Sequence, residues 1–305
     1  MKDSPYFNQV RLMLRVMPYI TAEEGFALKG GTAINLFIRD MPRLSIDIDL
    51  VWLPFESRNA ALDNISSALN RISDSIRNKI PGITVRETRL QGTSHIVRLA
   101  IGTPGAMIKI EPNLVIRGTV FPCEARDLCK AAEELFELTT TATTASMADL
   151  YGGKLCAALD RQHPRDIFDI KVLMEKEGIT EKIRTAFIIY LASHDRPMNE
   201  LLNPNRVDFR SAYEREFSGM TLRQVDYQEL ISDRERIIHT VNQSLTEKER
   251  NFLLSLKQGQ PDWELLSVRG LDRLPAVQWK LINIQKMSKA KHMQSMEKLR
   301  KVLGL

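Results

Sequence analysis

The run LSIDIDLVWLP at residues 44–54 alternates aliphatic and acidic side chains with a period of two and ends at a proline. Side chains two apart on a strand lie on the same face, roughly 7 Å from each other. A strand here presents Asp47 and Asp49 on one face and Ile48 and Leu50 on the other. The chain must therefore build a sheet with one face in the core and one face that carries acids.

The first half of the chain alternates between helical and strand patterns. Its expected helices span residues 4–21, 32–38 with Thr32 as the cap, and 57–79. Besides 44–54, its expected strands are the apolar run before Gly30 and residues 83–90, 95–102 and 106–116. These patterns predict a mixed sheet with helices packed on it.

The second half is almost entirely helical, with helices expected at residues 146–161, 165–178, 180–194 and 245–259. In the last of these, Thr246 and Glu249 fit a reciprocal capping box, and Gly259 suits the C-terminal cap. The fold class is therefore mixed α+β. We expect a sheet core over residues 1–140 and a helical lobe over residues 141–305.

Composition limits the class of protein. The 305 residues are 43% hydrophobic, which is enough for a sizeable core, and no apolar run approaches the roughly 18 residues of a spanning helix. Polar residues interrupt the N-terminal apolar run, so we expect no signal peptide and a cytoplasmic protein without a membrane partner. Three cysteines without metal-ligand spacing are expected as buried, small apolar side chains. The last 26 residues hold seven basic residues and one acid, which predicts a solvated face or a surface for a polyanion.

The two acids of the strand need an explanation, because adjacent carboxylates repel each other unless a positive charge compensates them. Exposure of this face to water, or ion pairs with arginines such as Arg39 and Arg43, would be enough to offset the repulsion. The segment MIKIEPN offers a third acid, Glu111, which points outward from a strand that could neighbour the first. Three such carboxylates suit a hard cation, Mg²⁺ or Mn²⁺.

Two glycines and several basic residues could form a binding site for phosphate groups. Gly30 and Gly31 lie between a strand and a helix, where glycine permits a close approach of backbone N–H groups to a phosphate; an ordinary tight turn is the alternative. In GGKLCAALDRQHPRDIFDI, a lysine and two arginines could neutralise a triphosphate, and either of two aspartates could hold the lysine or contact the nucleotide. These residues are Lys154, Arg161, Arg165, Asp166 and Asp169. A salt-bridged surface between helices is the other interpretation.

Five segments, in their order along the chain, resemble the AbiEii/AbiGii toxin family, to which the MenT toxins belong. They are GGTAINLFIRDMPRLSIDIDL, IKIEPN, GGKLCAALDRQHPRDIFDI, LTEKERNFLLSLKQGQPDWELL and LPAVQWKLIN. The resemblance runs from about residue 25 to residue 284. It implies a DNA polymerase β-type nucleotidyltransferase fold. It also implies a metal-dependent transfer of a nucleotide from an NTP to RNA, with tRNA 3′ ends as the acceptor, and release of pyrophosphate. A neighbouring antitoxin, often a winged-helix repressor, and a role in phage defence or growth arrest are implied as well.

The resemblance assigns roles to individual residues. Asp47, Asp49 and Glu111 match the metal ligands of the family, and Arg43 and Ser45 match its RxSxD element. Lys154 matches the lysine that contacts the NTP, and Asp166 matches the acid of the RD element, with Asp169 as a rival. The catalytic residues are then Asp47, Asp49, Lys154 and Asp166. The expected nucleotide-binding residues are Gly30, Gly31, Thr32, Ser45, Lys154, Arg161, Arg165 and Asp169.

Two other functions compete with nucleotidyl transfer. One is phosphotransfer to a protein or to the chain's own Ser45, using the same metal site. The other is a noncatalytic protein that binds RNA or an antitoxin through the basic C-terminal segment. Clustered acids are costly and a binding protein has no need of them, which favours an enzyme.

Overall fold

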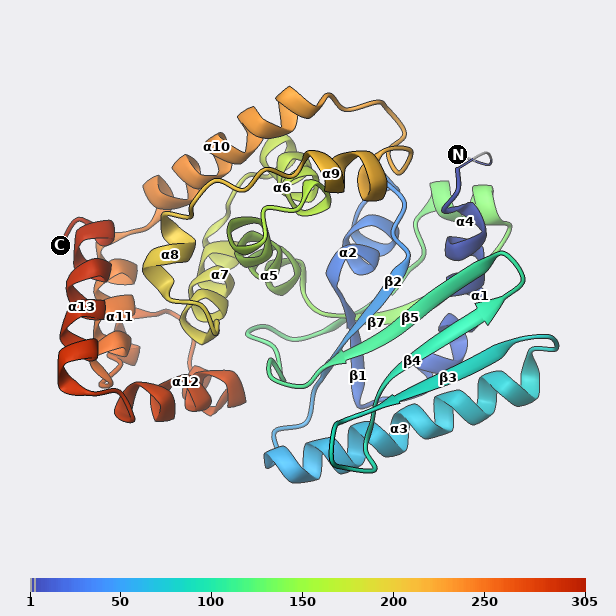
Figure 1. The fold of residues 1–305 in the computed structure, drawn as a ribbon, viewed down its shortest axis with the longest axis horizontal. Helices are drawn as coiled ribbons and strands as arrows, with labels where there is room; N and C mark the ends of the chain where they lie inside the picture. The colour runs from blue at the N-terminus through green and yellow to red at the C-terminus, as the bar shows by residue number, and fades with distance from the viewer. Residues whose placement is uncertain (1, 3) are drawn as a thin grey trace. The chain divides into compact units, whose positions relative to one another are not determined.

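The computed structural model describes residues 2 and 4–305, which form two compact units. The first unit runs to Ser146 and includes the later segment Ser218–Gln224, and the second consists of Met147–Phe217 and Val225–Leu305. The first contains the sheet and the second is helical (Figure 1). The mixed α+β fold class is confirmed.

In the described part of the chain, seven strands form one mixed sheet in the order β3-β4-β5-β2-β1-β7-β6. The pairs β2–β5 and β1–β7 are parallel, and the other neighbours are antiparallel. The strand with the two acids, β2, is therefore an interior strand. The strands are β1 (Phe26–Lys29), β2 (Asp47–Trp52), β3 (Thr84–Arg89), β4 (Ile96–Thr103), β5 (Ala106–Asn113), β6 (Glu124–Asp127) and β7 (Thr141–Thr144).

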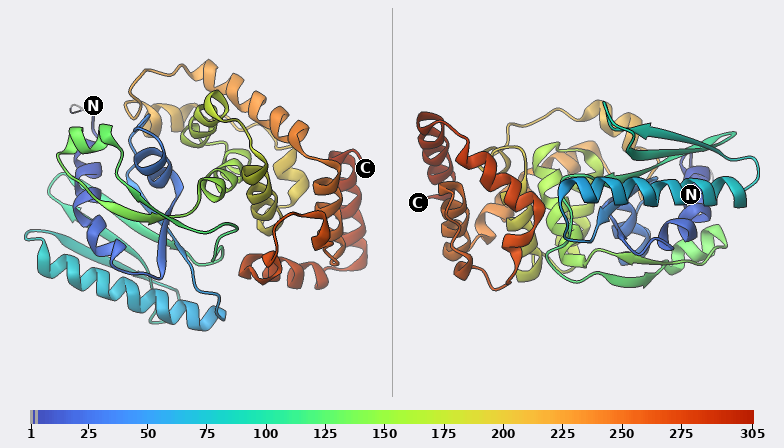
Figure 2. Two further views of the ribbon diagram at one scale, coloured as in Figure 1. Left: turned by 180° about the vertical axis from the view of Figure 1, so that it is seen from behind. Right: turned by 90° about the horizontal axis from the view of Figure 1, so that it is seen from below.

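Two long helices pack on one face of this sheet, α1 (Phe7–Thr21) against β5 and α3 (Arg58–Lys79) against β4 (Figures 1 and 2). Their apolar residues recur every three or four positions and are buried, as in an amphipathic helix. Burial of this stripe against the aliphatic face of the strands forms the core of the first unit. Three shorter elements complete the unit: α2 (Gly30–Ala33), the π-helix η1 (Ile34–Ile38) and α4 (Lys130–Phe136).

The second unit consists of helices of very different length. At Gly152, a Cβ atom would lie 2.6 Å from the backbone nitrogen of Phe187, so this glycine permits the close approach of two helices, α5 and α7. The predicted capping box of Thr246 and Glu249 is present, and Gly259 ends that helix with φ +88°. The elements are α5 (Met147–Asp160), α6 (Pro164–Lys176), α7 (Glu181–Ser193), α8 (Met198–Leu202), α9 (Arg210–Ala212), η2 (Tyr213–Phe217), α10 (Tyr227–Ser244), α11 (Glu247–Gln258), η3 (Trp263–Leu265), η4 (Leu271–Arg273), α12 (Pro275–Gln285) and α13 (Lys289–Leu303).

Several local expectations were wrong for identifiable reasons. The helix expected at residue 32 begins at Gly30, so Thr32 is an interior residue and not its cap. The last predicted strand ends at Asn113, because the Asn113 side chain accepts the backbone N–H groups of Val115 and Ile116 and turns the chain. The short polar strands β6 and β7 show no apolar alternation and were not predicted.

Two of the cysteines and one basic residue of the C-terminal segment also differ from expectation. Cys156 is buried, but Cys123 and Cys129 are only half-buried. Most of the basic residues of α12 and α13 are exposed, as predicted for a solvated face. Lys280 is an exception, because its ammonium donates to the carbonyl oxygen of His194 and burial lowers its pKa to about 8.

Candidate functional site

The two acids of β2 lie on the face of the sheet that α1 and α3 leave open. Asp47 and Asp49 are half-buried, whereas Ile48 and Leu50 are at most 1% exposed on the opposite face. The period-two prediction for this strand is confirmed. The geometry follows from local alternation alone, since every second side chain of a strand faces the same way.

The register across the sheet brings a third acid to the same place. Glu111 of β5 is the direct partner of Asp49 across the parallel β2–β5 pair, and Lys109 is the partner of Asp47. Glu111 forms an ion pair with Arg98 of β4. Among the described residues, no group of three His, Cys, Asp or Glu side chains has a geometry that could hold a metal ion. The sheet thus aligns the three carboxylates by register, while the side chain of Glu111 is engaged by a cation.

Gly30 makes room for one of these acids. Its φ is +71°, a conformation that glycine adopts without strain. A Cβ atom at this position would lie 2.2 Å from Oδ2 of Asp49, so any other residue would displace that carboxylate. At Gly31, a Cβ atom would lie 2.6 Å from Nη2 of Arg43. The Gly-Gly pair is therefore packed directly against the acidic strand and the loop before it.

That loop is held by polar contacts in the interior of the unit. The hydroxyl of Thr32 donates to the backbone carbonyl of Asp47 at 2.5 Å and lies 3.0 Å from Oγ of Ser45. Arg43, 2% exposed, donates to the carbonyl of Leu44 at 2.8 Å. These contacts fix the start of β2. The structure therefore gives Thr32, Ser45 and Arg43 a positioning role next to the acids.

The second unit contains a separate cluster of charges. The Nζ atom of Lys154 lies 2.9 Å from Oδ1 of Asp166 and 3.1 Å from Oδ2 of Asp169. Arg161 donates to Asp166 through Nε at 2.5 Å and Nη2 at 3.0 Å. Lys154 is 7% exposed and both aspartates are at most 1% exposed, whereas the Arg161 side chain is 57% exposed. Two cations thus balance two anions, and only Arg161 presents its charge to solvent.

The electrostatics of this cluster favour ionised carboxylates. Burial by itself raises the pKa of Asp166, but the opposite effect of Lys154 and Arg161 is larger and holds this pKa well below its ordinary value. Asp166 is consequently ionised in the folded protein at neutral pH. Lys154 contacts both Asp166 and Asp169, so both carboxylates hold the lysine.

A tight turn between α5 and α6 brings these residues together. Gln162 adopts a positive φ of +50°, and Pro164 opens α6, where a missing N–H is harmless. The imidazole Nδ1 of His163 accepts the N–H of Arg165 as the helix cap. The Arg165 guanidinium lies 3.6 Å from Glu216, so it faces a different acid from Arg161.

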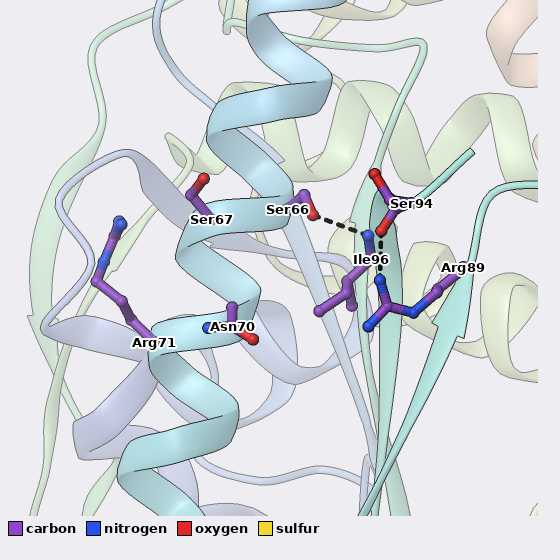
Figure 3. A pocket seen from close by; sticks show the side chains of 7 residues that line it. All are labelled: Ser66, Ser67, Asn70, Arg71, Arg89, Ser94 and Ile96. Carbon is purple, nitrogen blue, oxygen red and sulfur yellow. Dashed lines mark hydrogen bonds between the residues drawn. The ribbon is translucent and has the colours of Figure 1, made fainter.

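A cavity elsewhere in the first unit contains none of the predicted site residues. It measures about 440 Å³ between α3 and the β3–β4 hairpin (Figure 3). Arg71 donates to Glu23, and Arg89 donates to the carbonyl of Ser94, so both of its arginines already bind protein groups. We assign it no ligand. Its lining consists of Ser66, Ser67, Asn70, Arg71, Arg89, Ser94 and Ile96.

Comparisons with known proteins identify the fold and the family of the chain. The protein has the fold of nucleotidyltransferase toxins: it is similar to MenT4, a nucleotidyltransferase toxin from Mycobacterium tuberculosis H37Rv, with a TM-score of 0.61 and 15% sequence identity. That match covers 90% of this chain and 92% of MenT4. Residues 11–283 match the family described as nucleotidyl transferase AbiEii toxin, type IV TA system. No curated protein gives a significant match.

The chain belongs to the AbiEii family. It is therefore a nucleotidyltransferase toxin of a type IV toxin–antitoxin system, and such a system implies a cognate antitoxin. The resemblance in the sequence is confirmed. No helix in the described part of the chain is long and apolar enough to cross a membrane.

Proposed function

We propose that this toxin transfers a nucleoside monophosphate from an NTP to the 3′-hydroxyl of an RNA, with tRNA as the acceptor, and releases pyrophosphate. The observation that carries the proposal is the pair Asp47 and Asp49 on the open face of β2, with the Asp49 carboxylate in the space left by Gly30. Modification of tRNA in the cytoplasm would stop protein synthesis. That outcome accounts for growth arrest or phage defence, and a winged-helix repressor is the proposed antitoxin.

The donor set fits Mg²⁺ or Mn²⁺. Carboxylate oxygens are the ligands that these hard cations prefer, and Asp47 and Asp49 present two of them on one strand. Glu111 would join them as the third ligand, in exchange for its ion pair with Arg98. When bound, the metal polarises a phosphate oxygen and favours ionisation of a bound hydroxyl.

The remaining residues have proposed roles in binding the nucleotide. Gly30 and Gly31 bring backbone close to the acids, and Thr32 and Ser45 hold the start of β2 in place. In the second unit, the half-exposed guanidinium of Arg161 is suited to a phosphate, because it is planar and always charged. We propose that Asp166 orients Arg161, and that Lys154, held by Asp166 and Asp169, adds positive charge for the NTP. Arg165 is proposed as a second phosphate contact.

The test is a transfer assay with NTPs labelled in the α-phosphate, total tRNA and Mg²⁺. We expect label on the RNA with the native protein and none with Asp49→Asn, which keeps the shape of the side chain and loses its charge. Asp74→Asn is the matched control, because Asp74 is an exposed acid on α3, and it should retain activity. Equal labelling by the native protein and Asp49→Asn contradicts the proposal.

The same experiment separates the phosphotransferase alternative. Label from the γ-phosphate on the protein, with none from the α-phosphate on RNA, identifies a kinase that uses the same acids. Growth on induced expression adds a cellular readout. We expect arrest by the native protein and normal growth with Asp49→Asn at an equal amount of folded protein.

A further inference from the structure

Three cations lie beside the acids on the open face of the sheet. The register pairs Ala100 with both Arg86 and Lys109, and Lys109 with Asp47, so Arg86, Lys109 and Asp47 lie in one row across β3, β5 and β2. Arg98 of β4 lies in the adjacent row, beside Glu111. The open face thus changes from acidic at β2 to basic toward the β3 edge.

The cations on this face are accessible. Arg86 and Lys109 are exposed, and the Arg98 side chain is 47% exposed. The alternate residues of β4 and β5, such as Leu99 and Ile110, are fully buried on the opposite face. Within the described residues, no carboxylate lies at ion-pair distance from Arg86 or Lys109. Their charge is therefore available to a ligand from solvent.

Neutralisation of the β2 acids explains only part of this basic surface. Arg98 is paired with Glu111, and Lys109 is one strand away from Asp47, at roughly 5 Å. Arg86 is three strand spacings from β2, or roughly 14 Å, which exceeds the screening length of about 8 Å at physiological salt. Arg86 therefore does not compensate Asp47, and its charge faces solvent.

We propose that Arg86, Arg98 and Lys109 form an acceptor track, which binds the phosphate backbone of the RNA whose 3′ end is modified. This proposal rests on the proposed function. The charge complementarity is direct, since a strand of RNA carries one negative charge per nucleotide and phosphate contacts position a strand without reading its sequence. A strand that crosses β3 and β4 brings its end to Asp47 and Asp49.

The test measures RNA binding without catalysis. The dissociation constant of a fluorescent single-stranded RNA is determined by anisotropy over a range of salt concentrations, for the native protein and for Arg86→Gln/Lys109→Gln. Arg98 is left unchanged because it contacts Glu111. Each phosphate contact to a single strand contributes about 0.7 to the slope of log K against log salt, so we expect the slope to fall by about 1.4.

A matched control removes two positive charges from the other face of the sheet. Arg58→Gln/Lys79→Gln changes exposed residues of α3 and should leave the slope within about 0.3 of the native value. An equal loss of slope in both double variants would indicate a general charge effect and would overturn the acceptor track. An unchanged slope in Arg86→Gln/Lys109→Gln would overturn it as well.

The transfer assay distinguishes failure of the track from failure of the proposed function. If the native protein labels RNA and the track variant binds and uses RNA normally, the reaction stands and the track is refuted. If the native protein labels no RNA but the track variant loses the salt slope, the track stands and the reaction is refuted. With both correct, the variant raises the KM for RNA and leaves the KM for NTP unchanged.

Discussion

Replacing Asp166 with asparagine removes the carboxylate that both Lys154 and Arg161 contact. Removal of one partner of a buried ion pair costs about 3–5 kcal/mol, because the other charge stays buried. Lys154 retains Asp169 at 3.1 Å, so we expect a loss in the free energy of unfolding near the lower limit, about 3 kcal/mol. Asp169→Asn leaves Lys154 with Asp166, and the expected loss is about 1–2 kcal/mol.

Substitution of Arg161, the other cation that contacts Asp166, provides the comparison for this prediction. Its side chain is 57% exposed, so solvent screens its charge and Arg161→Gln should cost less than about 1 kcal/mol. Urea denaturation at neutral pH gives the three values. A loss for Asp166→Asn that is no larger than the loss for Arg161→Gln would show that the cluster does not hold α5 and α6 together.

The pH dependence gives a second readout for the same residue. The pKa of Asp166 in the folded protein lies below its ordinary value of 3.8, because Lys154 and Arg161 outweigh the effect of burial. The folded protein therefore binds fewer protons than the unfolded chain when the pH falls below about 4. The stability that this carboxylate contributes is complete above that pH and is lost as the pH falls toward the lower, folded-state pKa. Asp166→Asn should have a flatter acid limb than the native protein.

Four further substitutions test single contacts. Gly30→Ala should abolish transfer, because the added Cβ displaces the Asp49 carboxylate. The loss in the free energy of unfolding should be only about 1–2 kcal/mol. The transfer assay and urea denaturation measure the two effects. Gly152→Ala should destabilise by more than about 2 kcal/mol because it meets α7 backbone, whereas Gly153→Ala, with 4.0 Å of space, should be neutral or stabilising in thermal melts. Lys280 has a pKa of about 8, so native stability should rise with pH from about 8 to 10.5; Lys280→Met should remove that rise.

The faces of the strands could be predicted from sequence, but their register could not. Alternation is local, so it predicts that Asp47 and Asp49 share one face whatever strands lie beside them. The pairing of Glu111 with Asp49 depends on how β5 slides along β2, and a shift of one residue would have sent it into the core. For the same reason the sequence does not predict the ion pair between Arg98 and Glu111, since the strand that carries Arg98 has no unusual motif.

The charge cluster of the second unit shows a different limit. The sequence predicts that either Asp166 or Asp169 could hold Lys154, and in the structure both carboxylates contact it. Spacing could not predict that the turn at Gln162 folds α6 back and buries Lys154 between two carboxylates. Lys154, which the resemblance matches to the lysine that contacts the NTP, is charge-balanced within the protein by these aspartates. We therefore expect substitution of Lys154 to lower stability as well as any transfer activity, whereas substitution of the exposed Arg161 tests the proposed contact with the nucleotide at little cost in stability.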